Sequence, residues 1–153
     1  MLTSLLVAHG ICHVVVCPGS RNAPLIHNFN ECGGMQCHPV TDERSAGFYA
    51  LGMAQASGSP VAVCVTSGTA LLNLAPAVAE AFYQKLPLVV VSADRPGAFI
   101  GQLDGQTMPQ DNALGCFSRK SVNIPEPDDD TCRWHNNRLI NEALLECVCN
   151  GGG

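Results

Sequence analysis

Four short polar clusters in this chain of 153 residues carry side chains that could do chemistry. Each follows a short apolar or extended run: Pro18-Gly-Ser-Arg21, Asp42-Glu-Arg44, Thr66-Ser-Gly-Thr69 and Ser92-Ala-Asp-Arg-Pro96. A buried carboxyl group such as that of Glu43 could exchange protons near neutral pH. The guanidinium groups of Arg21 and Arg95 together suit a dicarboxylate. The clusters therefore suggest a site for a small anionic molecule.

Each cluster also has an ordinary structural interpretation. Gly19-Ser20-Arg21 suits a plain turn as well as an anion-binding helix start. Asp42 is well explained as a helix cap, and Glu43 as an acidic residue that complements the helix dipole. Asp94 and Arg95 could simply form an ion pair. No Walker motif, G-x-G-x-x-G or G-x-S-x-G is present in the sequence. Residue chemistry alone therefore leaves both the structural and the functional role open.

The elements that would position these clusters alternate between strands and helices. Apolar or extended runs predict strands at 14–17, 36–41, 61–65 and 87–92. Helical patterns predict helices at 2–9, 22–30, 42–57 and 67–85, the last kinked at Pro76. This alternation predicts an α/β fold: a doubly wound, mainly parallel sheet with helices on both faces. The clusters should then meet at the carboxyl edge of the sheet, where such folds bind ligands.

The remaining third of the chain is expected to be less regular. Its sequence predicts a long loop at 97–109, one more strand at 119–124, an acidic linker at 125–130 and a closing helix at 132–150. By length, residues 1–153 form a single domain, with the linker standing before the closing helix.

Composition narrows the class of protein. Charged residues make up only 14% of the chain, which suggests that part of the surface is covered by another domain or subunit. The net charge of −5 argues against nucleic acid as a partner, and the scattered basic residues argue against a membrane surface. Nine cysteines, an odd number without a C-x-x-C pair, predict reduced thiols. With no signal peptide or membrane span expected, these features indicate a cytoplasmic protein.

Taken in order, the clusters and the residues around them resemble one enzyme family. It is the MenD family, the thiamine-diphosphate-dependent SEPHCHC synthases, and the resemblance is to their N-terminal pyrimidine-binding (PYR) domain, over about Leu2 to Pro125. It is carried by Pro18-Gly-Ser-Arg-Asn-Ala-Pro-Leu25, Asp42-Glu-Arg-Ser-Ala-Gly47, Val65-Thr-Ser-Gly-Thr-Ala70, Asn73-Leu-Ala-Pro-Ala77 and Ser92-Ala-Asp-Arg-Pro96. The second and third of these suit several thiamine enzymes, whereas the first and last are much more specific.

The resemblance implies a reaction and a set of site residues. The family decarboxylates 2-oxoglutarate and adds the succinyl carbanion to isochorismate in menaquinone biosynthesis. Glu43 matches the catalytic glutamate that hydrogen-bonds the aminopyrimidine ring of the cofactor. Other positions match the cofactor-binding residues Pro18, Gly68 and Asn73 and the substrate-binding residues Ser20, Arg21, Arg95 and Gln106.

The resemblance also implies partners that this sequence does not contain. Full-length members use thiamine diphosphate with Mg²⁺ or Mn²⁺. The metal and diphosphate are held by a C-terminal domain from another subunit of a homodimer or homotetramer. The Gly-Asp-Gly segment of that domain is not found in residues 1–153. We therefore expect no metal site in this chain, and a chain that folds but neither binds the cofactor tightly nor turns over.

The residues are also compatible with two alternatives. The chain could belong to another thiamine carboligase of the acetolactate synthase kind, although the pair of arginines argues against this. It could also be a stand-alone α/β domain that holds a small anion at the strand edges.

Overall fold

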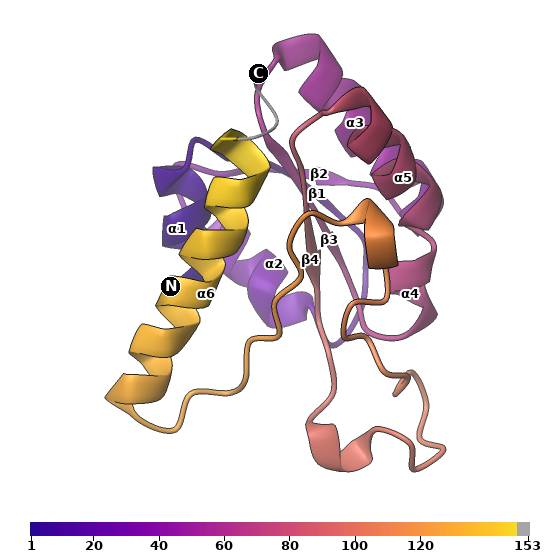
Figure 1. The fold of residues 1–153 in the computed structure, drawn as a ribbon, viewed down its shortest axis with the longest axis vertical. Coiled ribbons are helices and arrows are strands. Elements are labelled where there is room, and N and C mark those ends of the chain that lie inside the picture. Colours follow the sequence, from indigo (N-terminus) through magenta and orange to yellow (C-terminus); the bar gives the residue numbers. More distant parts are fainter. Residues whose placement is uncertain (150–153) are drawn as a thin grey trace.

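Four parallel strands form one sheet in the order β2–β1–β3–β4 (Figure 1). The computed structural model describes residues 1–149. Its strands are β1 (His13–Val16), β2 (Gln36–Pro39), β3 (Val61–Val65) and β4 (Leu88–Ser92). Strand β2 lies on one side of β1 in the sheet. The chain then crosses over, so that β3 lies on the other side of β1. The switch point of the sheet, where α/β folds bind ligands, therefore lies between β1 and β3.

Helices cover both faces of this sheet, which confirms the predicted doubly wound fold. On one face lie α1 (Leu2–Ala8), α2 (Ala23–Asn30) and α6 (Asp130–Cys149). On the other lie α3 (Glu43–Ser57), α4 (Thr69–Leu72) and α5 (Ala75–Gln84). Two short 3₁₀ turns, η1 (Gly97–Phe99) and η2 (Gly115–Phe117), interrupt the segment between β4 and α6.

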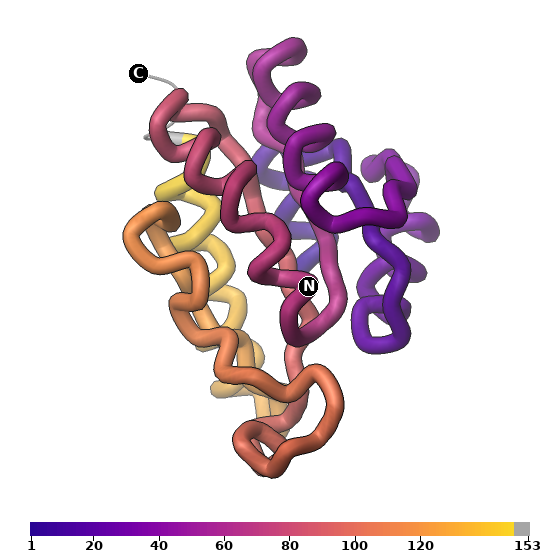
Figure 2. Tube along the Cα trace, turned by 90° about the vertical axis from the view of Figure 1, so that its right-hand side faces the viewer, coloured from indigo at the N-terminus to yellow at the C-terminus, as the bar shows by residue number. Residues whose placement is uncertain are grey.

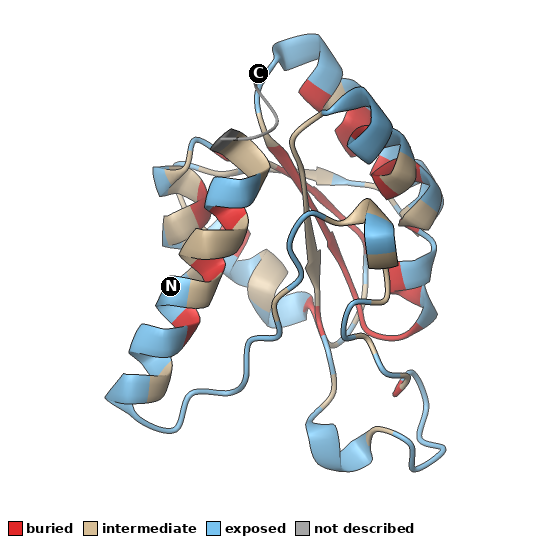
Figure 3. Ribbon diagram, viewed as in Figure 1, coloured by how far each residue is buried: buried red, intermediate tan, exposed pale blue. Residues whose placement is uncertain are grey.

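Alternate residues of the central strands divide the core between the two faces. Val14 and Val16 of β1 pack with α1, α2 and α6, whereas Val15 packs with α3 and α5. Every residue of β3 is buried, since helices cover it from both sides. Figure 3 shows the buried residues along the central strands and on the inner sides of the helices.

Helix α3 illustrates how the local sequence sets an element's ends. The Asp42 carboxylate accepts a hydrogen bond from the Ser45 N–H at 2.8 Å, which caps the helix at its start. Gly58 ends it in the left-handed conformation, with φ of 64°. Between these ends, Gly47 packs against α5, and a Cβ there would lie 2.8 Å from Cβ of Ala77.

The prediction of a strand at 119–124 is wrong. These residues are irregular, and within residues 1–149 the strand β4 pairs only with β3. The reason is that the segment has little to bury: Val122 is half-buried, and Ile124 and its polar neighbours are exposed. A strand with one side on the core needs a clear apolar alternation, which this segment lacks.

The predicted helix at 67–85 is not kinked but divided. The first part, α4, begins only at Thr69, because Gly68 has φ of 81°, outside the helical range. It ends at Leu72, and α5 starts again at Ala75, with Pro76 in its first turn. Proline suits that position because its missing N–H has no partner to lose there.

The closing helix begins earlier than the sequence predicts. The Asp129 carboxylate accepts a hydrogen bond from the Cys132 N–H at 2.6 Å, so the helix starts at Asp130. Residues 125–129 are exposed and irregular, as a linker would be. The predicted end at Asn150 lies outside the described residues. None of the helices in residues 1–149 combines the length and hydropathy needed to cross a membrane.

Candidate functional site

The carboxyl ends of the parallel strands meet at one edge of the sheet, at the bottom of Figure 1. The turns that follow β1 and β3 touch at the switch point, because Gly19 has no side chain. A Cβ at Gly19 would lie 2.4 Å from Cβ of Thr66, closer than real atoms approach. The loop after β4, residues 97–110, lies below this edge in Figures 1 and 2. It faces the turns after β1 and β3 across the site.

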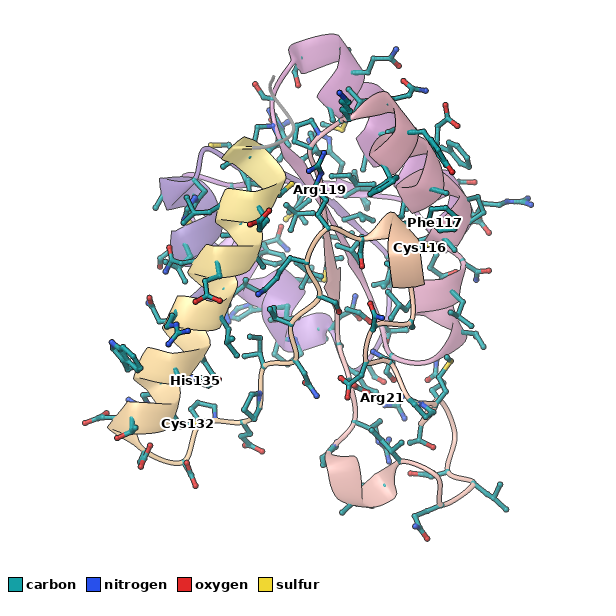
Figure 4. The ribbon with its side chains drawn as sticks, in the orientation of Figure 1. Arg21, Cys116, Phe117, Arg119, Cys132 and His135 are labelled. Carbon is teal, nitrogen blue, oxygen red and sulfur yellow. The ribbon has the colours of Figure 1, made fainter. Side chains whose placement is uncertain are left out.

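Arg21 binds this loop from the β1 side. Its Nη1 donates to Oε1 of Gln106 at 2.5 Å, and its Nη2 donates to the carbonyl oxygen of Gly105 at 3.3 Å. The Ser67 hydroxyl donates to the carbonyl oxygen of Gln106 at 3.1 Å. Figure 4 shows Arg21 at the lower edge of the sheet, directly above the loop. The structure thus brings together two of the predicted substrate-binding residues, Arg21 and Gln106.

Gly68 allows the loop to approach the turn after β3. A Cβ at Gly68 would lie 3.0 Å from Cα of Gln106, and the φ of 81° at Gly68 also disfavours any side chain. A pocket of about 380 Å³ opens between this turn and the loop. Its lining includes Thr69, Asp104 and Gln106.

Gln110 is a site residue that sequence reasoning missed. Its Oε1 accepts a hydrogen bond from the Gly68 N–H at 2.6 Å. Its Nε2 donates to the Ser92 hydroxyl and to the Ala93 carbonyl oxygen, both at 3.0 Å. One amide therefore ties the ends of β3 and β4 together. The available signal was the richness of the loop in glutamine, which does not say which glutamine bonds to which strand.

Arg95 is held by the same loop from the β4 side. Its guanidinium forms an ion pair with the Asp104 carboxylate and lies 5.1 Å from the centre of the Phe99 ring. The Asp94 carboxylate instead accepts a hydrogen bond from the Arg95 backbone N–H at 2.7 Å. Asp104, which the sequence did not single out, is thus the acidic partner of Arg95 in the structure.

Glu43 lies at the start of α3, with Asn73 of the α4–α5 break beside it. The Asn73 Nδ2 donates a hydrogen bond to Oε2 of Glu43 at 3.3 Å. The Glu43 side chain is half-buried. One carboxylate oxygen is therefore oriented by an amide, at an edge that a ligand can reach.

The negative charges of Glu43 and Asp42 affect the thiol of Cys17, which follows β1. The pKa of the buried Cys17 thiol is raised to about 12, mainly by burial, with further contributions from Glu43, Cys64 and Asp42. Such a thiol stays protonated and is a poor nucleophile. The pKa of Asp42 is lowered because its carboxylate accepts the hydrogen bond from Ser45, which suits a cap rather than a proton donor.

Three buried polar atoms next to the switch point have no hydrogen-bond partner among residues 1–149. They are Nε of Arg21, Oδ1 of Asn22 and Oγ1 of Thr66. Because buried polar atoms are normally bonded, these atoms point to a site completed by a ligand or by water. Pro18 and Ser20 are exposed in the turn that follows β1.

Potential metal ligands do not form a cluster in the described part of the chain. Among the described side chains of residues 1–148, no three or more from His, Cys, Asp or Glu gather closely enough to hold a metal ion. The eight cysteines whose side chains are described are all free thiols. The described side chains therefore contain neither a cluster of potential metal ligands nor a disulfide.

Comparison with known proteins places these residues in one family. Residues 1–114 match the family described as "Thiamine pyrophosphate enzyme, N-terminal TPP binding domain", and this span contains all four clusters. The chain is also similar to curated proteins named 2-succinyl-5-enolpyruvyl-6-hydroxy-3-cyclohexene-1-carboxylate synthase. It is 58% identical over 152 residues to that of Bacteroides thetaiotaomicron, covering 99% of this chain and 27% of the relative.

Two further relatives of the same name show similar coverage. The chain is 56% identical over 152 residues to the protein of Phocaeicola vulgatus, covering 99% of this chain and 27% of the relative. It is 52% identical over 139 residues to that of Desulfotalea psychrophila, covering 90% and 26%. The chain therefore spans about a quarter of the length of the curated relatives it matches.

Proposed function

Because this chain belongs to the thiamine pyrophosphate enzymes, through their N-terminal TPP binding domain, we propose that it is the pyrimidine-binding part of a SEPHCHC synthase. That enzyme decarboxylates 2-oxoglutarate and transfers the succinyl group to isochorismate. The observation that carries this proposal is the identity of 56–58% over 99% of the chain to proteins of that name. Identity this high extends well beyond the motifs that several thiamine enzymes share.

Glu43 is the proposed catalytic residue. Its role is to donate a hydrogen bond from its carboxyl group to a ring nitrogen of the cofactor's aminopyrimidine and to exchange that proton with the ring. When bound, thiamine diphosphate supplies the electron sink that decarboxylation requires. The bond from Asn73 at 3.3 Å supports this role, because it orients Oε2 and leaves the second oxygen for a ligand. A domain packed over the half-buried carboxyl group would remove it from water and favour proton exchange.

The substrates are proposed to lie along the edge between Arg21 and Arg95. Both substrates carry carboxylates, and two guanidinium groups can hold them through charge-assisted hydrogen bonds. Gln106 and Ser20 would add neutral polar contacts beside Arg21. Pro18 and Gly68 are proposed to shape the wall beside the pyrimidine ring, where Gly68 lets the backbone of Gln106 pack closely against the turn after β3.

The chain's donor set fits the organic half of the cofactor. Carboxylate, amide and unpaired buried polar atoms suit an aminopyrimidine, whereas the described residues offer no group of ligands for a divalent cation. Mg²⁺ or Mn²⁺ and the diphosphate would accordingly be held by a separate diphosphate-binding domain, from another subunit of a homodimer or homotetramer. Exposed apolar side chains on α3, α4 and α5 provide a surface that a partner could cover: Phe48, Leu72, Phe82 and Tyr83.

A chimera tests the proposal directly. This chain replaces the matched 152 residues of the Bacteroides thetaiotaomicron relative, and SEPHCHC formation is measured with isochorismate and 2-oxoglutarate. We expect turnover that depends on thiamine diphosphate and falls at least about a hundredfold in Glu43→Gln. The matched control Glu31→Gln, on the exposed end of α2, should retain activity. Near-normal turnover of Glu43→Gln would contradict the assignment.

The 153-residue chain by itself should fold without binding thiamine diphosphate tightly. Calorimetry measures this, and micromolar affinity would show that the cofactor needs no second domain.

A further inference from the structure

Both arginines of the proposed substrate site are already engaged, and by one short segment. Residues 104–106 supply the Asp104 carboxylate to Arg95, and the Gly105 carbonyl oxygen and Gln106 side chain to Arg21. A substrate carboxylate that approaches either guanidinium therefore meets a group of the protein's own chain. The contact at Arg95 differs in kind, because its partner is itself a carboxylate.

Asp104 lies where a ligand can displace it. Its Oδ2 pairs with Nη2 of Arg95, and its Oδ1 accepts a hydrogen bond from the Gly105 N–H at 2.9 Å. The side chain of Asp104 is 46% exposed, whereas that of Arg95 is 22% exposed. The aspartate is thus the outer member of the pair. Exposed ion pairs are weak, so a competing carboxylate can replace this one without a large energetic cost.

The loop around Asp104 is held in an unusual backbone conformation. Leu103 and Gln106 have positive φ angles of 61° and 58°, which residues with side chains rarely adopt. The Leu103 side chain is fully exposed, so its own packing does not stabilise the positive φ at this residue. The polar contacts of residues 104–106 contribute to holding the loop, together with the packing of Gln106 against Gly68 and the hydrogen bond from the Thr107 hydroxyl to the Asp104 carbonyl oxygen.

We propose that Asp104 acts as an internal competitor for Arg95 and thereby selects ligands with two carboxylates. This inference rests on the proposed function, because it takes Arg95 to face the substrate. A dicarboxylate can bind Arg21 with one end and replace the Asp104 carboxylate with the other, which leaves Arg95 paired. A monocarboxylate bound at Arg21 cannot make that exchange, so Asp104 stays in place.

The size of the effect follows from the exposure of the pair. A ligand that must first displace Asp104 binds with a reduced apparent affinity. That affinity equals the intrinsic affinity multiplied by the fraction of chains in which Arg95 is free. For an exposed ion pair this reduction is at most about fivefold. Removing the charge of Asp104 should therefore tighten dicarboxylate binding about two- to fivefold.

NMR titration of the 153-residue chain at low ionic strength tests this with two four-carbon probes, succinate and butyrate. In Asp104→Asn, succinate should bind about two- to fivefold more tightly than in the unaltered chain, whereas butyrate, which can use only one guanidinium at a time, should gain clearly less than succinate. Asp104→Ser should behave in the same way, which guards against an effect of the amide. The control Asp111→Asn removes an exposed charge near the same loop and should leave both affinities unchanged.

Unchanged or weaker succinate binding in Asp104→Asn overturns the inference, and so does the absence of binding in every variant. Arg95→Met separates this failure from failure of the proposed function. If Arg95→Met abolishes succinate binding while Asp104→Asn does not tighten it, only the competitor role of Asp104 is wrong. If Arg95→Met binds succinate normally, Arg95 is not part of the substrate site, and that part of the proposed function fails as well.

Discussion

The side-chain amide of Asn73 donates a hydrogen bond to Oε2 of Glu43 at 3.3 Å, across 30 residues of sequence. Glu43 opens α3, and Asn73 lies in the break between α4 and α5. The close packing of α3 on α5 at Gly47 brings these two helix ends together. The orientation of the proposed catalytic carboxylate is therefore coupled to a helix interface as well as to the sheet edge.

Asn73→Ala should lower kcat/KM of the chimera about tenfold, because the hydrogen bond to a carboxylate is lost while the fold is kept. Steady-state kinetics and a thermal melt measure the two effects separately. Asn123→Ala, at an exposed amide, is the control. If Asn73 acts through Glu43, the losses in Asn73→Ala and Glu43→Gln are not additive, and strict additivity would contradict the coupling.

Two glycines of α3 should respond to alanine in opposite directions. Gly47→Ala places a Cβ 2.8 Å from Ala77, so it should lower the free energy of unfolding by about 1–3 kcal/mol. Gly52→Ala has no neighbour within 4 Å and should raise it by about 0.5–1 kcal/mol through helix propensity. Urea unfolding measures both. Equal effects of the same sign would mean that α3 and α5 do not pack closely at Gly47.

The two thiols at the ends of β1 and β3 should be nearly inert in the folded protein. Burial raises the pKa of Cys17 to about 12 and that of Cys64 to about 11, so little thiolate forms at pH 8. The exposed Cys12 and Cys116 should react with a thiol reagent at least about a hundredfold faster. Mass spectrometry of the labelled peptides distinguishes them. Rapid labelling of Cys17 in the native state would show that this end of the sheet opens.

Stability should fall between neutral pH and pH 5 because of His38. Burial, followed by the neighbouring His13 at 3.1 Å, lowers the pKa of His38. The unfolded chain takes up a proton near pH 6.5, whereas the folded protein does so only at lower pH. Acid therefore favours unfolding across this window, and stability rises again as pH increases to about 7.

Urea unfolding at pH 5 and pH 7.5 checks the prediction for His38. His38→Gln should show a smaller difference between the two pH values than the unaltered protein, whereas His27→Gln, at an exposed position of α2, should not. An unchanged difference in His38→Gln would contradict the role of this histidine.

Local sequence patterns were sufficient for most of the fold. Apolar runs bounded by turn residues marked β1, β3 and β4, a weaker extended run marked β2, and Asp42 and Gly58 marked the ends of α3. The strand predicted at 119–124 failed because Val122 and Ile124 suggest an alternation that no packed face supports. The break at Asn73 also escaped prediction, since a proline inside an apolar run suits a kink as well as a new helix start.

The sequence by itself determined that this chain is an α/β domain of the thiamine pyrophosphate enzymes, with its polar clusters at one sheet edge. Periodicity and turn chemistry are local properties, so a single sequence carries them. The tertiary structure decided which of those residues meet. Arg21 reaches Gln106 across 85 residues, and Gln110 and Asp104 enter the site from a loop without any motif. These contacts depend on how closely the turns at Gly19 and Gly68 approach their neighbours, and a missing side chain gives no local sign of what will occupy its space.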